Sequence, residues 1–303
     1  MAYHNQWQRA MGGYLNEMAP FIGAETRRRY RIWLSQAGDL VGWVNPKQLT
    51  LTDMRRIESE IPGTHNTKSV RCHVARKFLR WAGNLEAQKW RILSKQMAKM
   101  DGVFLTEHQV AMIREIARGL GTQFELIFSL GVDNGLRSVD MSRLKISNAQ
   151  QLLANGSSMI IGKGRNGGKP RLLTLSEMTF RPLTEYMKHR DQLLDAYQME
   201  FQDLFLDFNH ITRRVYALKP ENIQSRVIII SEASGIYFRS HDQRKTFGNR
   251  HWRIGTPLET IARMMGHESV DQTFKAYIGV QISDMLEAQR KLANLAPPRP
   301  VQM

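Results

Sequence analysis

Residues 240–277 read SHDQRKTFGNRHWRIGTPLETIARMMGHESVDQTFKAY, and this stretch decides how the rest of the chain is interpreted. It opens with a polar turn of helix, which Ser240 is expected to cap. His241 and Arg244 follow three residues apart, so they share one face of that helix. An imidazole beside a guanidinium is suited to binding a phosphate.

The second half of the stretch predicts two further helix boundaries. The sequence TPLE from Thr256 is typical of a capping box with proline at the first helical position, and Gly266 suits the C-terminal stop. His267 therefore lies just past a helix end. A further start at Ser269 opens a helix that carries Tyr277 near its C-terminal end.

Length and composition are those of an ordinary globular protein with room for two domains. Of the 303 residues, 42% are hydrophobic and 23% are charged. No apolar run approaches the ~18 residues of a membrane span, and the first residues lack the hydrophobic segment of a signal peptide. A single cysteine, Cys72, excludes a disulfide scaffold and favours a reducing compartment. We therefore expect a cytoplasmic, nucleoid-associated protein that has no membrane partner.

Positive charge is the strongest signal in the composition. Lys and Arg number 43 against 28 Asp and Glu, which gives a formal net charge of +15 and a pI near 10.1. A charge of this size attracts polyanions, so nucleic acid is the expected partner. The alternative is that the charge serves solubility alone.

Residues 1–101 are predicted to form a helical DNA-binding domain. Residues 1–100 contain 17 Lys or Arg against 7 Asp or Glu. One basic helix begins near Thr26, and another shows the apolar stripe Val70, Val74, Phe78 and Trp81. The basic side chains expected to meet DNA phosphates here are Arg27, Arg28, Arg31, Arg71 and Lys77. Four tryptophans could stack on bases, but helical spacing favours the core for Trp33, Trp43, Trp81 and Trp90.

Residues 102–303 are predicted to form a second domain, after a short polar joint at residues 99–102. A hydrophobic staple and capping box at residues 105–109 start a helix that runs to about Gly119. Residues 123–132 are apolar enough to form a buried helix. A glycine-containing turn then puts Arg137 at the head of a new helical turn.

A β-hairpin is predicted next. Its strands are residues 158–161 and 171–175, separated by the glycine-rich segment GKGRNGGKP. Lys163, Arg165 and Lys169 make this tip basic and suited to contact DNA. Because no G-K-[ST] sequence occurs there, nucleotide hydrolysis is not expected.

The last third of the chain is expected to be helical. Residues 176–199 form one helix by periodicity. Residues 227–230 have strand propensity, but an apolar stripe closed by Gly235 favours a helix. An amphipathic helix over residues 282–296 ends the chain. The predicted fold is therefore mainly α with a small β-hairpin.

Six positions, taken in order, resemble the tyrosine recombinases, also called the phage integrase family. They are Arg137 in NGLRSVDMSRLK, Lys163 in IIGKGRNGGKPRLLTL, His241 and Arg244 in SHDQRKTF, His267 in MMGHES, and Tyr277 in QTFKAY. The resemblance covers residues 104–296, and the residues before it are similar to the family's core-binding domain in position, charge and helicity. Two positions depart from the family pattern: Gln243 replaces the usual Leu, and Lys245 replaces a common His.

The resemblance implies a site-specific recombinase that cleaves and rejoins double-stranded DNA. Tyr277 would be the nucleophile and would form a covalent 3′-phosphotyrosine. Arg137 and Arg244 would clamp the phosphate oxygens, and His267 would donate a hydrogen bond to the same phosphate. Neither a metal nor any other cofactor is then needed.

The same resemblance supplies the proton transfers. His241 would be the base that activates the tyrosine, and Lys163 would protonate the leaving 5′ oxygen. Lys169 lies on the same hairpin and is the alternative acid.

The family also implies a homotetramer on DNA, and a monomer is one option for the protein in solution. The segment at residues 282–296 would dock on a neighbouring protomer. The alternative is that this helix packs on its own domain.

Two other functions are weighed against the recombinase. Residues 258–277 resemble a helix-turn-helix, which would make the protein a non-catalytic DNA-binding regulator, but Gln272 sits where that motif has an apolar residue. A metal nuclease would use His241, His251 and His267, but these lack clustered carboxylates or cysteines at ligand spacing.

Overall fold

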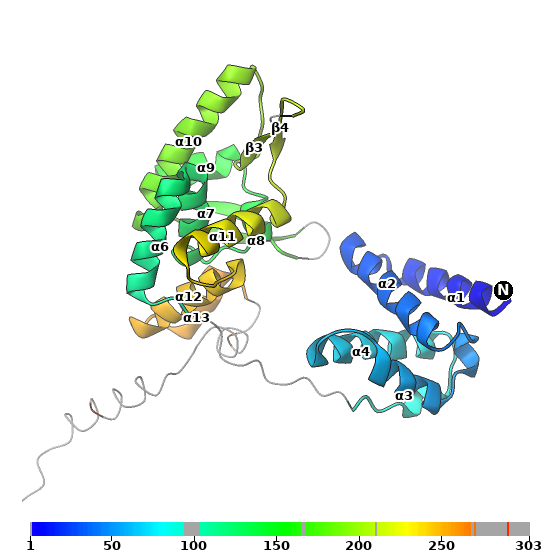
Figure 1. Cartoon of the computed structure of the whole chain (residues 1–303). Coiled ribbons are helices and arrows are strands. Elements are labelled where there is room, and N and C mark those ends of the chain that lie inside the picture. Colours follow the sequence, from blue (N-terminus) through cyan, green and yellow to red (C-terminus); the bar gives the residue numbers. More distant parts are fainter. Residues whose placement is uncertain are drawn as a thin grey trace, which may run out of the picture. The chain divides into compact units, whose positions relative to one another are not determined.

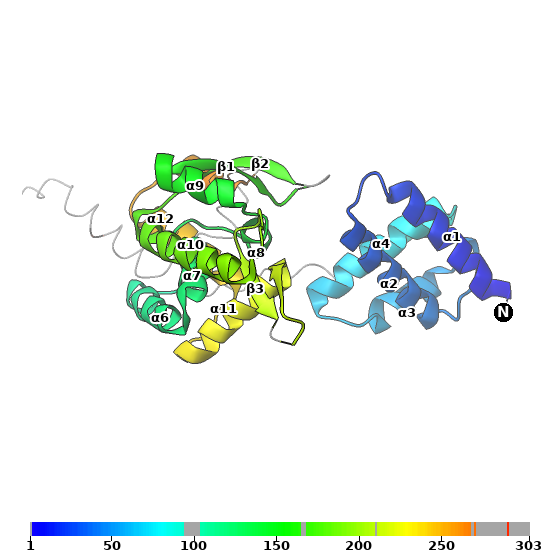
Figure 2. The same cartoon turned by 90° about the horizontal axis from the view of Figure 1, so that it is seen from above.

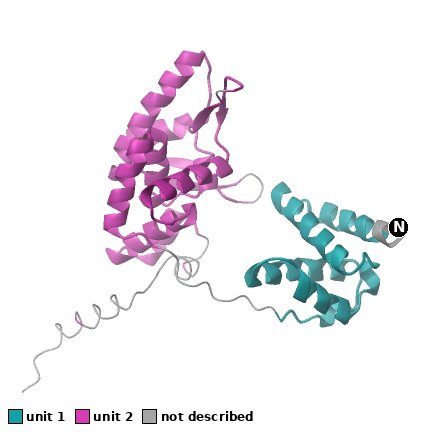
Figure 3. Ribbon diagram, viewed as in Figure 1, with its two compact units in different colours: residues 1–100 teal, residues 101–303 magenta. Residues whose placement is uncertain are grey.

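The chain divides into two compact units, residues 1–100 and 101–303 (Figure 3). The computed structural model describes residues 2–93, 104–164, 168–209, 211–267, 270 and 290. The joint at 99–102, the helix start at Ser269 and Tyr277 lie outside these described residues, as does the segment 282–296 apart from residue 290.

Unit 1 is helical (Figure 1). Its elements are α1 (Ala2–Met18), α2 (Ala24–Leu40), η1 (Pro46–Gln48), α3 (Leu51–Glu60), α4 (His65–Trp81) and α5 (Glu86–Lys89). Thr50 and Thr64 cap α3 and α4 through their hydroxyl oxygens, which each accept from the backbone N–H three residues on. The centre of the unit is aromatic, since Trp7, Phe78 and Trp90 are fully buried there.

The buried face of α4 differs from the predicted stripe. Val74 and Phe78 are buried as expected, but Val70 and Trp81 are each 39% exposed. The face that packs inward runs instead through Ser69, Cys72, Val74, Ala75, Phe78 and Leu79. The prediction was right for half of the stripe and wrong for its two ends.

The tryptophans of unit 1 are mostly core residues, as predicted. Trp90 is fully buried, and Trp33 and Trp43 pack half-buried against the core. Trp81 is the exception, because it lies at the surface, where its indole N–H donates to Glu17 over 2.7 Å.

Unit 2 contains the remaining described helices and two small sheets. Its elements are α6 (Glu107–Leu120), α7 (Thr122–Val132), α8 (Ser138–Met141), α9 (Ile146–Asn155), β1 (Ser157–Gly162), β2 (Lys169–Thr174), α10 (Glu177–Tyr197), β3 (Leu206–Asn209), β4 (Arg214–Ala217), α11 (Pro220–Ser234), α12 (Ser240–Arg253) and α13 (Leu258–Met265).

Helix α7 is the centre of unit 2. Every residue from Glu125 to Val132 is buried, and α6, α10, α11 and α12 all pack on it. The β1–β2 hairpin and α9 lie together on one side of α7, opposite α6 and α11 (Figure 2). Because helices surround α7 on several sides, its sequence is apolar all round and lacks a polar face.

Several local predictions for unit 2 are confirmed. Thr106 and Gln109 form a capping box at the start of α6. Strands β1 and β2 pair antiparallel, with Ser157 opposite Thr174 and Gly162 opposite Lys169. Residues 227–230 are helical, in α11, which Gly235 ends in the left-handed conformation that glycine accepts most readily.

Two predicted N-caps are shifted by one residue. Arg239 is the N-cap of α12 and Ser240 is its first helical residue. Pro257, not Thr256, is the N-cap of α13, and no side-chain capping bond forms there. The predicted helices exist, but their caps depend on local geometry that the residue types alone did not distinguish.

The antiparallel β3–β4 hairpin was not predicted. Its strands, LDFN and RVYA, are only four residues long, and the alternation of apolar and polar residues in LDFN does not recur in RVYA. Leu206 and Val215 are buried against Leu194 of α10, so tertiary packing stabilises this hairpin. Among the described helices, none has the length and apolar character needed to cross a membrane.

Candidate active site

Arg244 is the most deeply buried residue of the predicted site. Its side chain on α12 has no exposed surface. The guanidinium donates to the backbone oxygens of Gly135 and Met265, and its Nη2 lies 2.9 Å from His267 Nε2. Gly135 has φ +63°, and a Cβ there would lie 2.5 Å from the Phe247 ring, so glycine is needed at this turn. The backbone therefore fixes the Arg244 guanidinium in one position.

His267 follows the end of α13 directly, as predicted. Gly266 takes the left-handed conformation there, and the His267 N–H donates to Ala262 O over 2.9 Å. Burial lowers the pKa of His267 to about 3, and the positive charges of Arg244, Arg137 and Arg171 add to the effect. His267 is therefore neutral at physiological pH.

The tautomer of His267 follows from its partner. A guanidinium only donates hydrogen bonds, so the Nε2 that faces Arg244 is an acceptor. The ring proton then resides on Nδ1.

The lowered pKa of His267 predicts a loss of stability in acid. In the unfolded chain His267 has a pKa near 6.5 and binds a proton below that pH. In the folded protein its pKa is about 3, so it stays neutral until the pH falls that far. The free energy of unfolding should therefore fall as pH drops through this range, by at most about 1.4 kcal/mol per pH unit from this group. Urea unfolding at pH 7, 5 and 4 should show a steeper fall for the wild type than for His267→Gln. Parallel curves would contradict the neutral assignment.

Arg137 is held at the N-terminus of α8 by Asp140. The Asp140 carboxylate accepts from the Arg137 N–H over 3.2 Å and from the Lys163 N–H over 2.9 Å. It also accepts from Arg171 Nη2 on β2 over 3.0 Å, while Arg171 Nη1 donates to Met264 O over 2.9 Å. Asp140 is 1% exposed, so three separate segments converge on one buried carboxylate.

Asp140 and Arg171 were missed in the sequence. An acidic residue three positions after Arg137 was a visible capping signal. Arg171 gave no comparable sign, because a single Arg on a strand usually faces solvent. Burial lowers the pKa of Arg171, partly offset by the charge of Asp140.

A cavity of about 280 Å³ brings four of the predicted residues together. They are Arg137, Lys163, His241 and Arg244, with Ser138, Val139, Pro220, Gln224 and Ser240 completing the wall. The Ser138 and Ser240 hydroxyls lie 2.7 Å apart and join α8 to α12 beside the cavity. Arg244 also contacts His267, so five predicted residues form one positively charged site.

The predicted DNA-binding residues occupy surface and half-buried positions. Arg28 pairs with Glu25 over 2.8 Å, and Arg31, Lys77 and Lys169 are exposed. Arg71 is partly buried, with its guanidinium carbon 5.6 Å from the Trp33 ring centroid. Arg27 is also half-buried, and Arg165 lies outside the described residues.

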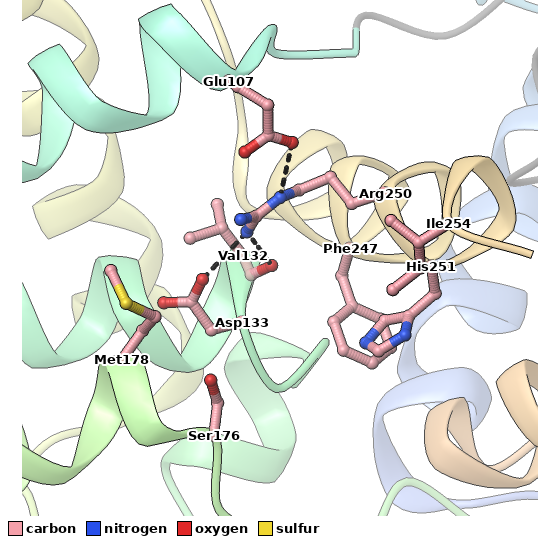
Figure 4. A pocket seen from close by; sticks show the side chains of 9 residues that line it. All are labelled: Glu107, Val132, Asp133, Ser176, Met178, Phe247, Arg250, His251 and Ile254. Atoms are coloured by element: carbon pink, nitrogen blue, oxygen red, sulfur yellow. Dashed lines mark hydrogen bonds and ion pairs between the residues drawn. The ribbon is translucent and has the colours of Figure 1, made fainter. Parts of the chain in front are cut away.

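A second cavity lies beside α12 but contains none of the six predicted residues. Its volume is about 260 Å³, and Figure 4 shows Arg250 between Glu107 and Asp133 in its wall. Arg250 Nε lies 2.8 Å from Glu107, and Nη1 lies 2.9 Å from Asp133. These ion pairs tie α12 to α6 and α7 and so support the helix that carries Arg244.

Gln243 is buried beside Arg244, and its amide makes no hydrogen bond to the described residues. Its side chain is 0% exposed, and neither amide atom has a hydrogen-bond partner among the described residues. A Cβ at Gly131 of α7 would lie 2.2 Å from Gln243 Oε1, so the two helices pack closely at this point.

We expect Gln243→Leu to stabilise the protein. Removing an unpaired buried amide should raise the free energy of unfolding by about 1–3 kcal/mol, measured by urea unfolding. Gln150→Leu on the exposed face of α9 is the matched control and should change it by less than about 0.5 kcal/mol. A less stable Gln243→Leu variant would mean that the amide has a partner.

In the part of the chain that the structure describes, no three His, Cys, Asp or Glu side chains gather closely enough to hold a metal ion. The alternative function of a metal nuclease would have needed such a group.

Comparison with known proteins defines the class. The model of the phage integrase family matches residues 103–283, a range that contains all six predicted catalytic residues. The tyrosine recombinase XerA of Pyrococcus horikoshii is 23% identical over 207 residues, which cover 68% of this chain and 67% of the relative.

Solved structures show the same fold. The Tn1549 transposon integrase, in complex with circular intermediate DNA, has a TM-score of 0.68 at 13% identity and covers 94% of this chain and 99% of its own. XerH site-specific recombinase bound to palindromic difH substrate also has a TM-score of 0.68, at 17% identity, and covers 91% of this chain and 82% of its own.

The chain belongs to the phage integrase family. It is a site-specific DNA recombinase of the tyrosine type. The predicted family and the predicted mainly helical fold with a small β-hairpin are thereby confirmed.

Proposed function

We propose that the positively charged site binds the scissile phosphate of double-stranded DNA and that Tyr277 attacks it. Attack builds negative charge on the non-bridging oxygens, which fixed guanidinium groups stabilise. Arg137 and Arg244 are the two cations for this role, and the Nδ1–H of neutral His267 is a further donor. The convergence of Arg137, Lys163, His241 and Arg244 on one cavity is the observation that carries the proposal.

The proposed chemistry is a transesterification. The Tyr277 oxygen forms a bond to phosphorus while the bond from phosphorus to the 5′ oxygen breaks. The phenol has an unperturbed pKa near 10, so its proton needs an acceptor, which we assign to His241. Lys163 gives a proton to the leaving 5′ oxygen. The products are a 3′-phosphotyrosine and a 5′ hydroxyl, and the reverse reaction rejoins the strand without ATP or a metal.

Lys163 is preferred over Lys169 as the acid. Lys163 lines the cavity together with Arg137, whereas Lys169 is not among the cavity residues. Lys169 and the other basic residues of the hairpin are assigned to DNA contact, as are Arg27, Arg28, Arg31, Arg71 and Lys77 of the helical unit 1. Unit 1 is thus proposed to be the DNA-binding domain and unit 2 the catalytic domain.

Covalent capture from a library tests the function. The protein is incubated with a library of nicked duplexes in EDTA, and the products are run on denaturing gels. A protein–DNA adduct that survives denaturation and carries one preferred sequence is the expected result. No adduct, or cleavage that needs a divalent ion, would overturn the proposal. The recovered duplex serves as substrate in the experiments below.

We also propose assembly into a homotetramer on DNA through residues 282–296, which apart from residue 290 lie outside the described residues. An isolated helix of this length is marginal in water, so its apolar face needs a partner. A protein that lacks residues 282–303 should fold and bind a single site but fail to form tetramers or recombine, measured by gel shift and sedimentation. Full recombination by the truncated protein, or its unfolding, would show that the helix serves its own domain.

Double-stranded DNA as the substrate also supports the expected location in the cytoplasm with the nucleoid.

A further inference from the structure

The Gly162–Lys163 peptide group, at the end of β1 where the tip of the hairpin begins, is hydrogen-bonded at both its oxygen and its nitrogen. The Gly162 carbonyl accepts from Arg143 Nη1 over 2.9 Å. The Lys163 N–H, which belongs to the same peptide group, donates to Asp140 Oδ1 over 2.9 Å. A peptide is planar, so bonds to its oxygen and its N–H together fix its orientation. The Lys163 Cα is thereby fixed as well.

The ends of β1 and β2 around this peptide are closely packed. A Cβ at Gly168, where φ is +129°, would lie 2.5 Å from Gly162 O and 2.6 Å from Arg143 Nη1. A Cβ at Gly164 would lie 2.8 Å from the Lys169 N. Glycine at both positions lets the two strands close on the Arg143 side chain, which is itself partly buried.

The two residues that hold the peptide come from the turn that carries Arg137. Asp140 is in α8 and Arg143 follows that helix by two residues. One short segment therefore presents a ligand for the phosphate and both contacts to the Gly162–Lys163 peptide. The position of Lys163 is tied to the position of Arg137 by this segment.

A fixed backbone matters for Lys163 because its side chain is long and flexible. It is exposed, and its amine sits on a flexible four-carbon stem. A general acid must lie within hydrogen-bond reach of the oxygen that it protonates. Fixing the backbone limits the positions that the amine can reach.

We propose that Arg143 is a positioning residue for the general acid Lys163, acting through the Gly162 carbonyl and without contact to the phosphate. This rests on the proposed function, in which Lys163 protonates the leaving 5′ oxygen. Loss of the Arg143 donor should misplace the lysine and slow cleavage about a hundredfold, the cost of a displacement near 1 Å.

A substrate whose leaving group needs no general acid distinguishes the positioning of Lys163 from other effects of losing Arg143. The captured duplex is made with either oxygen or sulfur at the 5′ bridging position of the scissile phosphate. A thiol has a pKa near 8.5, so the thiolate leaves without being protonated. Arg143→Met should be about a hundredfold slow on the oxygen substrate and within about threefold of wild type on the sulfur substrate. Arg143→Lys, which keeps a donor, should fall between the two on the oxygen substrate.

Other variants make the outcomes distinct. Lys163→Met should show the same rescue by sulfur, and failure of that rescue would overturn the acid role of Lys163 and hence the proposed function. Arg137→Ala should be slow on both substrates. Lys145→Met removes a nearby positive charge that pairs with Asp203, and it should behave as wild type on both. If Lys163→Met is rescued but Arg143→Met stays slow on both substrates, or is never slow, the inference about Arg143 is wrong.

Amide exchange supplies a readout without DNA. In protein labelled with ¹⁵N-lysine, the Lys163 amide is identified by its absence from Lys163→Met. Its hydrogen exchange should accelerate in Arg143→Met while the other lysine amides stay unchanged. Equal acceleration of every lysine amide would indicate general destabilisation, and an unchanged Lys163 amide would contradict the positioning role.

Discussion

Tyr277→Phe should bind the captured duplex with wild-type affinity and form no covalent adduct. Phe keeps the ring and its packing but has no oxygen to attack phosphorus. Gel shift should therefore show normal binding, while denaturing gels show DNA alone. The expected loss is complete, because a covalent step without its nucleophile has no residual route to the same adduct.

Tyr237→Phe is the matched control. Tyr237 is 65% exposed and its ring lies 5.4 Å from the Arg239 guanidinium carbon, so the hydroxyl has no part in the proposed chemistry. This variant should form adduct at the wild-type rate. An adduct with Tyr277→Phe would show that another residue is the nucleophile.

Arg137→Ala and Arg244→Ala should each reduce cleavage by about a hundredfold to a thousandfold. In the proposed mechanism each variant removes a fixed cation that stabilises the charge developing on the phosphate, which is worth about 3–4 kcal/mol. The length of the DNA footprint should barely change. Single-turnover cleavage of the captured duplex measures the rate, and footprinting measures the contact.

The two substitutions should differ in their effect on the stability of the protein. Arg244 is fully buried and bonded to two backbone carbonyls, so Arg244→Ala should also lower stability. The Arg137 side chain is 26% exposed and should give the same rate defect with little change in thermal unfolding. Wild-type cleavage by folded Arg137→Ala would show that this Arg is only a surface charge.

Much of unit 2 could be predicted because its signals are local. A capping box at Thr106 and stops at Gly235 and Gly266 depend on residues a few positions apart. The basic tip with glycines marked the β1–β2 hairpin for the same reason. The order of the six site residues was visible as well, since each lies in a short motif.

What could not be predicted depends on contacts between distant segments. The β3–β4 hairpin is too short to show a pattern and is stabilised by packing against α10. Asp140 gains its role from Lys163 and Arg171, which lie 23 and 31 residues away in the sequence. On α4, Val70 and Trp81 fit the helical period, but which side faces inward depends on the helices that pack on it.

In the proposed mechanism, the burial of Arg244 has a consequence for each catalytic turnover. Removing a guanidinium from water is unfavourable, and here that desolvation occurs once, when the chain folds around the Gly135 and Met265 carbonyls. No water shell has to be stripped from this cation, and no rotamer has to be frozen, when DNA arrives. Binding energy that a mobile arginine would consume in ordering itself therefore remains available for the rest of the reaction.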